Sequence, residues 1–350
     1  RLSDALQPLG DPAAVRRAAC RILGERLGAD RVVYAEVLPD DMHVDMGESW
    51  LAPGVAALDG RLRMADFGAS LLPRLRSGSP LVVDDVAASD AIAPPAREAY
   101  RRLGVAAYVS SPLLKDGRFV ANLNVHQGAP RRWTAQEVAL IGETAERTWA
   151  AAQQTRAETA LRRGEAVLAA QREALVIALS GGPLERSLGV LGRCASALLD
   201  ERPRTAFFLA NPDGASLRHV VGMPPDYAAA VDGFVIGPNS LACGLAAHSG
   251  EAVITPDVRI DPPWAPWRDL AARYAYRACW SFPIRSAEGA FVGAFSLYWS
   301  DTREANDSDV ALIGLFVQSA SIIIARDMEG KRRQKAEDDL RESEARFRQF

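Results

Sequence analysis

Two cysteines in the second half of the chain have the residue type and the setting for thiol chemistry. Cys243 lies in the run Ala242-Cys243-Gly244, and Cys279 follows 36 residues later on an expected central strand. A helix that begins near Gly244 would lower the pKa of the Cys243 thiol and favour the reactive thiolate. The pair could therefore form a redox-sensing or ligand-sensing site. The alternative is that both thiols pack as small hydrophobic side chains.

Disulfide and metal chemistry have less support in the sequence. The four cysteines, at positions 20, 194, 243 and 279, form no C-x-x-C pair and have no histidine at the spacing of zinc ligands. His126 has no second histidine, cysteine or carboxylate cluster that would make it a haem or metal ligand. We therefore expect reduced thiols, no metal site and no catalytic residue in this chain.

Aromatic residues gather around Cys279 and could form the walls of a cavity for a small ligand, with Asp257 or Arg268 as its polar contact. On the expected strand, Cys279 and Ser281 share one face and Trp280 takes the other. Packing of the same aromatic rings in a core is the alternative. The candidate ligand-binding residues in this half are Cys243, Asp257, Trp264, Trp267, Arg268, Cys279, Trp280 and Tyr298.

The first half holds a second candidate site. Asn122, Asn124 and His126 lie at i, i+2 and i+4 of an expected strand, so they point to one face together. The apolar residues between them would then face the core, and the polar face would meet either solvent or a ligand. The candidate ligand-binding residues here are Tyr34, Trp50, Phe67, Tyr108, Asn122 and His126.

An internal repeat organises these residues. Residues 138–142 (VALIG) recur as residues 310–314, at an offset of 172. Further pairs at the same offset are Asp85-Val86 with Asp257-Val258, Asp116-Gly117 with Glu288-Gly289, and Arg131 with Arg303. A match in this order over so long a stretch predicts two tandem copies of one domain, in which the second copy is expected to be the better ligand binder.

Each copy predicts the same succession of elements. Copy one has helices at 12–27 and 95–103, strands at 31–37 and 80–84, a hairpin of 106–113 with 118–126, and a long helix from the capping box Thr134-x-x-Glu137. Copy two has helices at 184–199 and 267–273, strands at 205–210, 216–221 and 252–254, a hairpin of 278–285 with 290–300, and a helix from Asn306. This order predicts an α+β fold in which helices flank a central antiparallel sheet in each domain.

Both copies resemble GAF domains, the sensory modules of bacterial signalling proteins. The resemblance is carried by residues 237–244, 252–258, 277–284 and 293–298 in copy two, and by residues 81–86, 112–117 and 125–126 in copy one. It implies a GAF domain at 1–152, a connecting signalling helix at 153–180, a second GAF domain at 181–326 and a coiled helix at 327–350. The motifs that resemble bilin attachment or cyclic-nucleotide binding in this family are missing, so the cofactor stays unknown.

The connecting segment predicts a dimer. Residues 134–179 contain no proline, and Leu161, Leu168 and Leu175 repeat at seven-residue spacing. We expect this long helix to pair with its copy in a parallel homodimer; a solvated connector is the alternative. The segment Leu340–Arg348 resembles the helix that opens a PAS domain in sensor kinases. That resemblance implies a truncated PAS domain and a downstream histidine kinase in cis, with a response regulator as partner.

Composition and charge limit the binding partners and the cellular location that we expect. The chain has 350 residues and a formal net charge of −3, which provides no global attraction to nucleic acid or anionic lipid. It shows no secretion signal and no run of about 18 apolar residues, so we expect a cytoplasmic protein with no membrane segment. The missing initiator Met and the cut at Phe350 favour a sensory fragment of a longer protein.

The expected function is that of a signal-transduction input module, which senses a small molecule or redox state and relays it through dimeric helices to an output domain, most simply a histidine kinase. Two alternatives stay open. One is a purely structural dimerisation array without a ligand. The other is a thiol-dependent methionine sulfoxide reductase of the GAF type, which would use Cys243 or Cys279. Whether the chain is an enzyme is left undecided.

Overall fold

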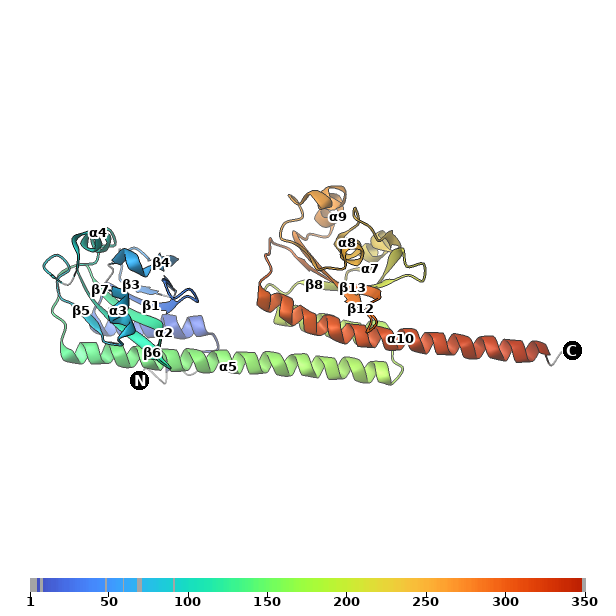
Figure 1. Ribbon diagram of the computed structural model, residues 1–350, viewed down its shortest axis with the longest axis horizontal. Helices are drawn as coiled ribbons and strands as arrows, with labels where there is room; N and C mark the ends of the chain where they lie inside the picture. The colour runs from blue at the N-terminus through green and yellow to red at the C-terminus, as the bar shows by residue number, and fades with distance from the viewer. Residues whose placement is uncertain are drawn as a thin grey trace. The chain divides into compact units, whose positions relative to one another are not determined.

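The structure is a computed structural model that describes residues 5–6, 9–47, 49–58, 60–67, 71–90 and 92–347. It divides into two compact units, Arg1–Arg162 and Arg163–Phe350, which we describe separately. Figure 1 identifies their elements. The antiparallel sheets and flanking helices confirm the α+β class and the two-domain architecture joined by a long helix.

Unit 1 has a seven-stranded antiparallel sheet in the order β4-β2-β1-β7-β6-β5, with β3 paired to β1. Its strands are β1 (Arg31–Val37), β2 (His43–Asp45), β3 (Ser49–Leu51), β4 (Arg61–Arg63), β5 (Leu81–Val83), β6 (Ala107–Lys115) and β7 (Arg118–Gln127). Its helices are α2 (Pro12–Leu27), the 3-10 helix η1 (Met64–Phe67), α3 (Leu71–Arg76), α4 (Pro94–Arg102) and the start of α5 (Ala135–Leu179).

Local signals in the sequence account for several of these boundaries. Asp11 caps α2 by accepting hydrogen bonds from the backbone N–H groups of Ala13 and Ala14. Asp116 and Gly117 both adopt positive φ in the β6–β7 turn, as a tight hairpin turn requires. The predicted capping box of α5 is confirmed, because Thr134 N–H donates to Glu137 and Glu137 N–H donates to the Thr134 hydroxyl.

The sheet of unit 1 packs on both faces. On one face, Tyr34 and Leu123 lie in a core with Leu23 of α2 and with Ile141 and Ala145 of α5. Figure 1 shows these two helices on one side of the sheet and α4 on the other, within this unit. The second face carries the cluster that includes Val44, Met46 and Met64, from the short elements that follow β1. An interior space lies between this second face and the short elements that cover it.

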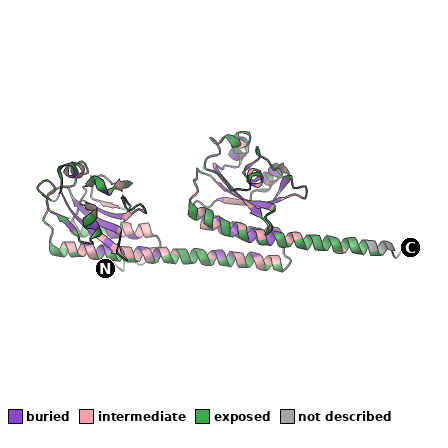
Figure 2. Cartoon of the chain, viewed as in Figure 1, coloured by how far each residue is buried: buried purple, intermediate pink, exposed green. Residues whose placement is uncertain are grey.

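Unit 2 repeats this plan with a six-stranded sheet in the order β10-β9-β8-β13-β12-β11. Its strands are β8 (Arg204–Ala210), β9 (Ser216–Val221), β10 (Phe234–Val235), β11 (Val253–Thr255), β12 (Ala278–Arg285) and β13 (Phe291–Trp299). Its helices are α6 (Leu184–Leu198), α7 (Pro225–Val231), α8 (Ala242–Ser249), the 3-10 helix η2 (Pro262–Trp267), α9 (Arg268–Arg273) and α10 (Asp307–Phe347). Figure 2 shows burial concentrated on the sheets and on the helix sides that meet them.

The strand registers of the two units coincide. Tyr34 pairs with Leu123 in unit 1, and Phe207 pairs with Phe295 in unit 2. Leu123 and Phe295, on the hairpin strands, differ by the repeat offset of 172 residues. Tyr34 and Phe207, on the first strands, differ by one residue more. The repeat found in the sequence is therefore also a repeat of sheet geometry.

The long helices carry the leucines that predicted a dimer. Leu161 and Leu168 of α5 are 64% and 67% exposed, whereas Leu175 is partly buried against the core of unit 2. Pairing between two chains through this helix stays a prediction. The segment Leu340–Arg348 is helical as far as Phe347, and its last residue lies outside the described part of the chain.

One helix in the described part of the chain is long and apolar enough to cross a membrane, over Asp307–Glu342 with a mean hydropathy of 1.8 in its most apolar window. Within that window 33% of the residues are buried inside the unit. Ile313, Phe316 and Ile324 are among them, packed in the same core as Trp280 of β12. A helix that supplies the core of a folded domain passes the same test, so this feature is weak evidence for a membrane span.

Candidate functional site

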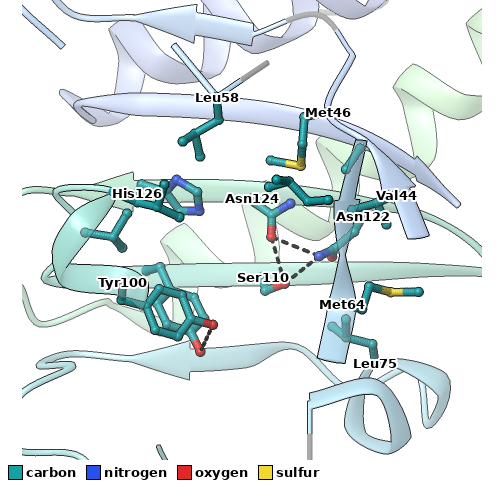
Figure 3. A pocket seen from close by; sticks show the side chains of 15 residues that line it. Val44, Met46, Leu58, Met64, Leu75, Tyr100, Ser110, Asn122, Asn124 and His126 are labelled. Atoms are coloured by element: carbon teal, nitrogen blue, oxygen red, sulfur yellow. Dashed lines mark hydrogen bonds between the residues drawn. The ribbon is translucent and has the colours of Figure 1, made fainter. Parts of the chain in front are cut away.

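A cavity of about 70 Å³ lies in unit 1 against the second face of the sheet (Figure 3). A space that admits one water measures roughly 10–15 Å³ on this scale, so the cavity accommodates a small molecule. Its walls are formed by Ala35, Val44, Met46, Leu58, Leu62, Met64, Leu75, Tyr100, Leu103, Val105, Tyr108, Ser110, Asn122, Asn124 and His126.

Strand β7 supplies the polar wall of the cavity. Asn122, Asn124 and His126 line it, while Leu123 and Val125 lie in the core on the opposite face of the sheet. This alternation follows from the two-residue period of a β-strand. The prediction that the three polar residues share one face is confirmed, and that face meets the cavity.

The two asparagines and Ser110 of β6 form a closed hydrogen-bonded triangle. Asn122 Nδ2 donates to Ser110 Oγ at 2.6 Å and to Asn124 Oδ1 at 2.9 Å, and Ser110 Oγ donates to Asn124 Oδ1 at 2.9 Å. Both amide hydrogens of Asn122 are therefore used. Its Oδ1 is buried and has no hydrogen-bond partner among the described residues. A buried acceptor in this condition is costly unless a ligand or a water supplies a donor.

His126 forms the other end of the polar wall and is held neutral. Burial, followed by the positive charge of Arg31, lowers its pKa to about 3. Arg31 Nη1 lies 3.5 Å from His126 Nδ1, and a guanidinium can only donate. The neutral ring therefore accepts at Nδ1 and carries its hydrogen on Nε2. The same guanidinium donates to the carbonyl oxygens of Ala56 and Leu103, which anchors two loops beside the cavity.

A tyrosine pair closes the floor near His126. Tyr100 Oη donates to Tyr108 Oη at 3.0 Å, and their rings stack with centroids 4.9 Å apart. Tyr108 also meets the His126 ring edge-on at 6.4 Å. Burial raises the pKa of Tyr108, so its hydroxyl stays protonated near neutral pH.

The lining contains no carboxylate, ammonium or guanidinium group. Its polar groups are neutral amides, hydroxyls and an imidazole, and the rest is apolar, including Met46, Leu58 and Met64 (Figure 3). A charged ligand would lose its hydration here without gaining an ion partner from the wall. The chemistry of the cavity therefore favours a small uncharged molecule with a polar edge and an apolar body.

The structure places the other candidates of the first half elsewhere. Tyr34 points into the core against the helices, on the face opposite the cavity. Trp50 of β3 packs against Gly24 of α2. The side chain of Phe67 lies outside the described residues. Sequence reasoning missed Ser110 and the two methionines; hairpin pairing of Ser110 with Asn124 was a signal available for the first.

In unit 2 the predicted residues on the corresponding face pack on one another. Cys243, Trp264, Cys279 and Tyr298 belong to one buried cluster, which also contains three further tyrosines, Tyr227, Tyr274 and Tyr276. Tyr227 Oη donates to Tyr298 Oη at 3.2 Å, and Trp264 Nε1 donates to Thr255 Oγ1 at 3.1 Å. These two hydrogen bonds tie the cluster together, whereas Tyr276 Oη is buried and has no hydrogen-bond partner among the described residues. Binding of a ligand by these residues stays a prediction.

Of the two interpretations of Cys243, the structure supports packing as a small buried side chain. Cys243 is 2% exposed inside the aromatic cluster, and burial raises the pKa of its thiol to about 12. Burial also raises the pKa of Cys279, with the neighbouring Cys243 as a second cause. The N-terminus of α8 does not overcome desolvation, because the thiol is enclosed by apolar atoms. Among the described residues no group of three His, Cys, Asp or Glu side chains could hold a metal ion.

The remaining candidates in unit 2 are spread over different surroundings. Asp257 forms ion pairs with Arg259 at 2.7 Å and Arg277 at 3.8 Å, and the hydrogen bond from Arg259 is the largest cause of its lowered pKa. Trp280 lies on the other face of the sheet, beside Trp299. Trp267 is half-buried and Arg268 is exposed. Trp267 thus packs against the cluster that contains the two cysteines. Trp280 lies in the other core of this unit, and Asp257 is engaged by its arginines.

Comparison with known proteins gives a consistent picture of the fold. Residues 11–152 match one family model described as a GAF domain, and residues 184–325 match a second model with the same description. A curated relative is a methyl sulfide methyltransferase-associated sensor of Methanosarcina acetivorans, which is 31% identical over 155 residues. That match covers 44% of this chain and 14% of the relative.

Two solved structures are also similar. The bacteriophytochrome RpBphP3 of R. palustris aligns over 93% of this chain and 74% of its own, with a TM-score of 0.54 and 11% identity. The PixJ GAF domain of Thermosynechococcus elongatus, in its blue-light absorbing form, aligns over 43% of this chain and 90% of its own, with a TM-score of 0.38 and 19% identity. At these identities the likeness concerns the fold alone.

Proposed function

Because the chain belongs to the GAF domain family, with GAF domains at residues 11–152 and 184–325, we propose that it is a signalling input module that binds a small uncharged molecule in the cavity of its first domain. GAF domains are sensory modules, and the curated relative is a sensor by name. Purely structural arrays would have no use for a polar wall inside an apolar cavity.

The observation that carries this proposal is the unpartnered acceptor of Asn122. The triangle with Ser110 and Asn124 consumes the donors of Asn122 and leaves its Oδ1 buried in the cavity wall without a partner. Leaving a buried acceptor unsatisfied costs about 1–3 kcal/mol. A ligand in the cavity that donates a hydrogen bond to this oxygen would recover that free energy.

Strand β7 also provides a route from the cavity to the connecting helix. Its polar face lines the cavity, and Leu123 on the opposite face lies in one core with Ile141 and Ala145 of α5. Helix α5 runs without interruption from Ala135 in unit 1 to Leu179 in unit 2. A shift of β7 on ligand binding would therefore act on a helix that both units share, as a two-state relay requires.

The output stage is part of the same proposal. We infer a homodimer through α5 and α10 that delivers the signal in the cytoplasm to a PAS domain and a histidine kinase in cis, with a response regulator as partner. Exposed Leu161 and Leu168 at seven-residue spacing support the dimer. The resemblance of Leu340–Arg348 to a PAS-domain opening helix supports the downstream arrangement.

Three probes of matched shape test the binding step: isobutyramide, isobutyrate and isobutylammonium, each titrated into the full chain while the melting temperature is recorded. We expect the amide to raise the melting temperature and the two ions to leave it unchanged. Asn122→Leu and the cavity-filling Ala35→Val should both abolish the shift, whereas Arg268→Ala on the surface of unit 2 should preserve it. A shift that survives both cavity variants, or one produced by the ions alone, would refute the proposal.

A further inference from the structure

A second hollow lies in unit 2, on the side of the sheet where α6 packs. It is an open groove of about 800 Å³ between α6 and the first strand, β8. Its floor includes the buried side chains of Leu188 and Phe207, and its walls include Gly192 and Ser196 of α6 and Thr205 of β8. At Gly192 an added Cβ would lie 2.7 Å from Thr205 Oγ1, so the helix and strand approach closely at the groove's base.

Unit 1 fills the corresponding place with a piece of its own chain. There, β3 pairs with the first strand over Arg31–Val33, and Trp50 lies opposite Val32. The indole packs so tightly on α2 that an added Cβ on Gly24 would lie 2.1 Å from a ring atom. By the shared sheet register, Val32 corresponds to Thr205. Trp50 therefore occupies in unit 1 the place that the groove leaves open beside Thr205 in unit 2.

The sequence of unit 2 explains why no equivalent strand forms. The partner of β8 on this side, β9, pairs only with Phe207–Ala210. The chain then passes Gly222, where a Cβ would lie 1.9 Å from the Thr205 carbonyl oxygen, and enters Pro224-Pro225 at the start of α7. Proline favours a helix start and supplies no backbone donor to a sheet. In the described part of unit 2, β8 has no second neighbour along Arg204–Ala206.

The charged residues that line the groove are all basic. Arg193, Arg202 and Arg204 line it, and the lining contains no acidic residue. Arg204 is used internally, because its guanidinium donates to the carbonyl oxygens of Tyr274 and Ala275. Arg193 and Arg202 are exposed, and neither forms an ion pair with a described residue. Such a rim attracts an acidic partner.

We propose that this groove is a docking site for an extended peptide segment of a partner protein, with an aromatic anchor and acidic residues beside it. The anchor would take the place that Trp50 takes in unit 1. Because Gly222 covers the Thr205 carbonyl, the segment is held by its inserted side chain and by ion pairs with Arg193 and Arg202, and not by extending the sheet. Aromatic anchors in small pockets dominate the energetics of such interfaces.

The chain itself contains a probe of this chemistry. Residues 43–53, HVDMGESWLAP, place Trp50 two residues after Glu48 and five after Asp45. A fluorescent synthetic peptide of this sequence, titrated into the full 350-residue chain and followed by anisotropy, should bind saturably. Replacement of its tryptophan by alanine, or of both acids by lysine, should weaken binding at least tenfold.

Groove variants locate the binding. Ser196→Trp fills the groove from α6 and should reduce peptide affinity at least tenfold. The double variant Arg193→Glu, Arg202→Glu keeps the core intact and should have a similar effect, greater at low salt. Arg186→Glu, on α6 but outside the groove lining, is the matched control and should bind as the parent does.

Three results would overturn the inference. One is absence of saturable peptide binding, and another is binding that survives both groove variants. The third is a change of oligomeric state with Ser196→Trp in sedimentation, which would assign the groove to a second copy of this chain instead of a partner. None of these results depends on the cavity of unit 1.

Discussion

Asn122 and Leu123 are neighbours on β7 and face opposite sides of the same sheet. Asn122 belongs to the polar wall of the cavity, whereas Leu123 is fully buried in the core that contains Ile141 of α5. A single peptide bond thus joins the polar wall of the cavity to the core that packs against the connecting helix. We expect a substitution at either residue to change the packing on both faces of the sheet, because a close-packed interior transmits strain.

Asn122→Asp tests the hydrogen-bond triangle at constant volume. An ionised carboxylate cannot donate to Ser110 Oγ or Asn124 Oδ1, and no cation lines the cavity. We expect a loss of about 2–4 kcal/mol in unfolding free energy at pH 7. Burial raises the pKa of the new acid, so the folded state binds more protons than the unfolded state, and the deficit should shrink as the pH falls toward 5.

Urea denaturation of this variant at pH 5 and pH 8 provides the measurement. Asn239→Asp, at an exposed loop position of unit 2, is the matched control and should show neither the loss nor its pH dependence. A deficit equal at both pH values would mean that the aspartate is not confined in a low-dielectric cavity.

His126 predicts a distinct dependence of stability on pH. Its pKa of about 3 in the folded chain lies below the ordinary value of about 6.5, so the unfolded chain binds the extra proton between these values. Stability therefore rises with pH through this window and is complete above about 6.5. At pH 5 the folded chain should have lost roughly 2 kcal/mol from this group alone.

Comparison with His126→Gln isolates this contribution, since every other titrating group is common to both proteins. The difference in unfolding free energy between the two should change with pH between 4.5 and 7, at about 1.4 kcal/mol per unit at most. A constant difference across the window would show that the imidazole titrates normally and faces water.

The thiols of Cys243 and Cys279 should be inert in the folded chain. A pKa of about 12 at Cys243, against about 9 for an unperturbed thiol, leaves roughly a thousandth of the ordinary thiolate at pH 8. Mass spectrometry after iodoacetamide treatment should show alkylation of Cys243 and Cys279 at least about a hundredfold slower in buffer than in urea. Rapid native labelling of Cys243 would restore the redox-sensor and reductase hypotheses.

How far the sequence predicts this fold depends on element length. The helices and hairpins with long hydrophobic periods, such as α2, β6–β7 and α5, were predicted within a few residues of their positions, because their pattern repeats several times. The three-residue strands β2, β3 and β4 and the short helix α3 were not predicted, because so few residues show no periodic pattern. The equally short β5 and β11 were predicted, because each contains a run of apolar residues. Of the unpredicted pieces, β2, β4 and α3 supply Val44, Leu62 and Leu75 to the cavity wall. Their places are set by packing in one cluster with Phe119 of β7, which is distant in the sequence.

The candidate site shows the same limit. Alternation along β7 correctly grouped Asn122, Asn124 and His126 on one face. Which copy has a hollow next to that face depends on side chains from separate segments. In unit 2 Tyr227 and Tyr276 occupy the cluster beside Cys279, whereas in unit 1 smaller or more flexible residues such as Val44 and Met46 border an open space. Burial of this kind also raises the pKa of the Cys243 thiol, in line with the alternative that it packs as a small hydrophobic side chain.

Two glycines in helices should respond to alanine in opposite directions. Gly164 of α5 has open space at its Cβ position, so Gly164→Ala should stabilise the helix by about 1 kcal/mol. Gly24→Ala should destabilise unit 1 by about 1–3 kcal/mol in spite of the same helical gain, because the Trp50 ring must move. Thermal unfolding followed by circular dichroism measures both. Equal stabilisation by the two changes would show that Trp50 is not seated against α2.

The leucines of α5 provide the test of the dimer on which signal relay depends. Leu161 and Leu168 are among the most exposed large apolar residues in the described chain, and seven-residue spacing places them on one side of the helix. If they pack against a second copy, Leu161→Lys with Leu168→Lys introduces like charges into that seam and should convert a dimer to a monomer in sedimentation velocity. Val235→Lys is the matched control, because Val235 of β10 is equally exposed at 67% and lies away from the long helices. A parent chain that is already monomeric at micromolar concentration, or a dimer unaffected by the double variant, would remove α5 as the pairing surface and leave the helix as a connector within one chain.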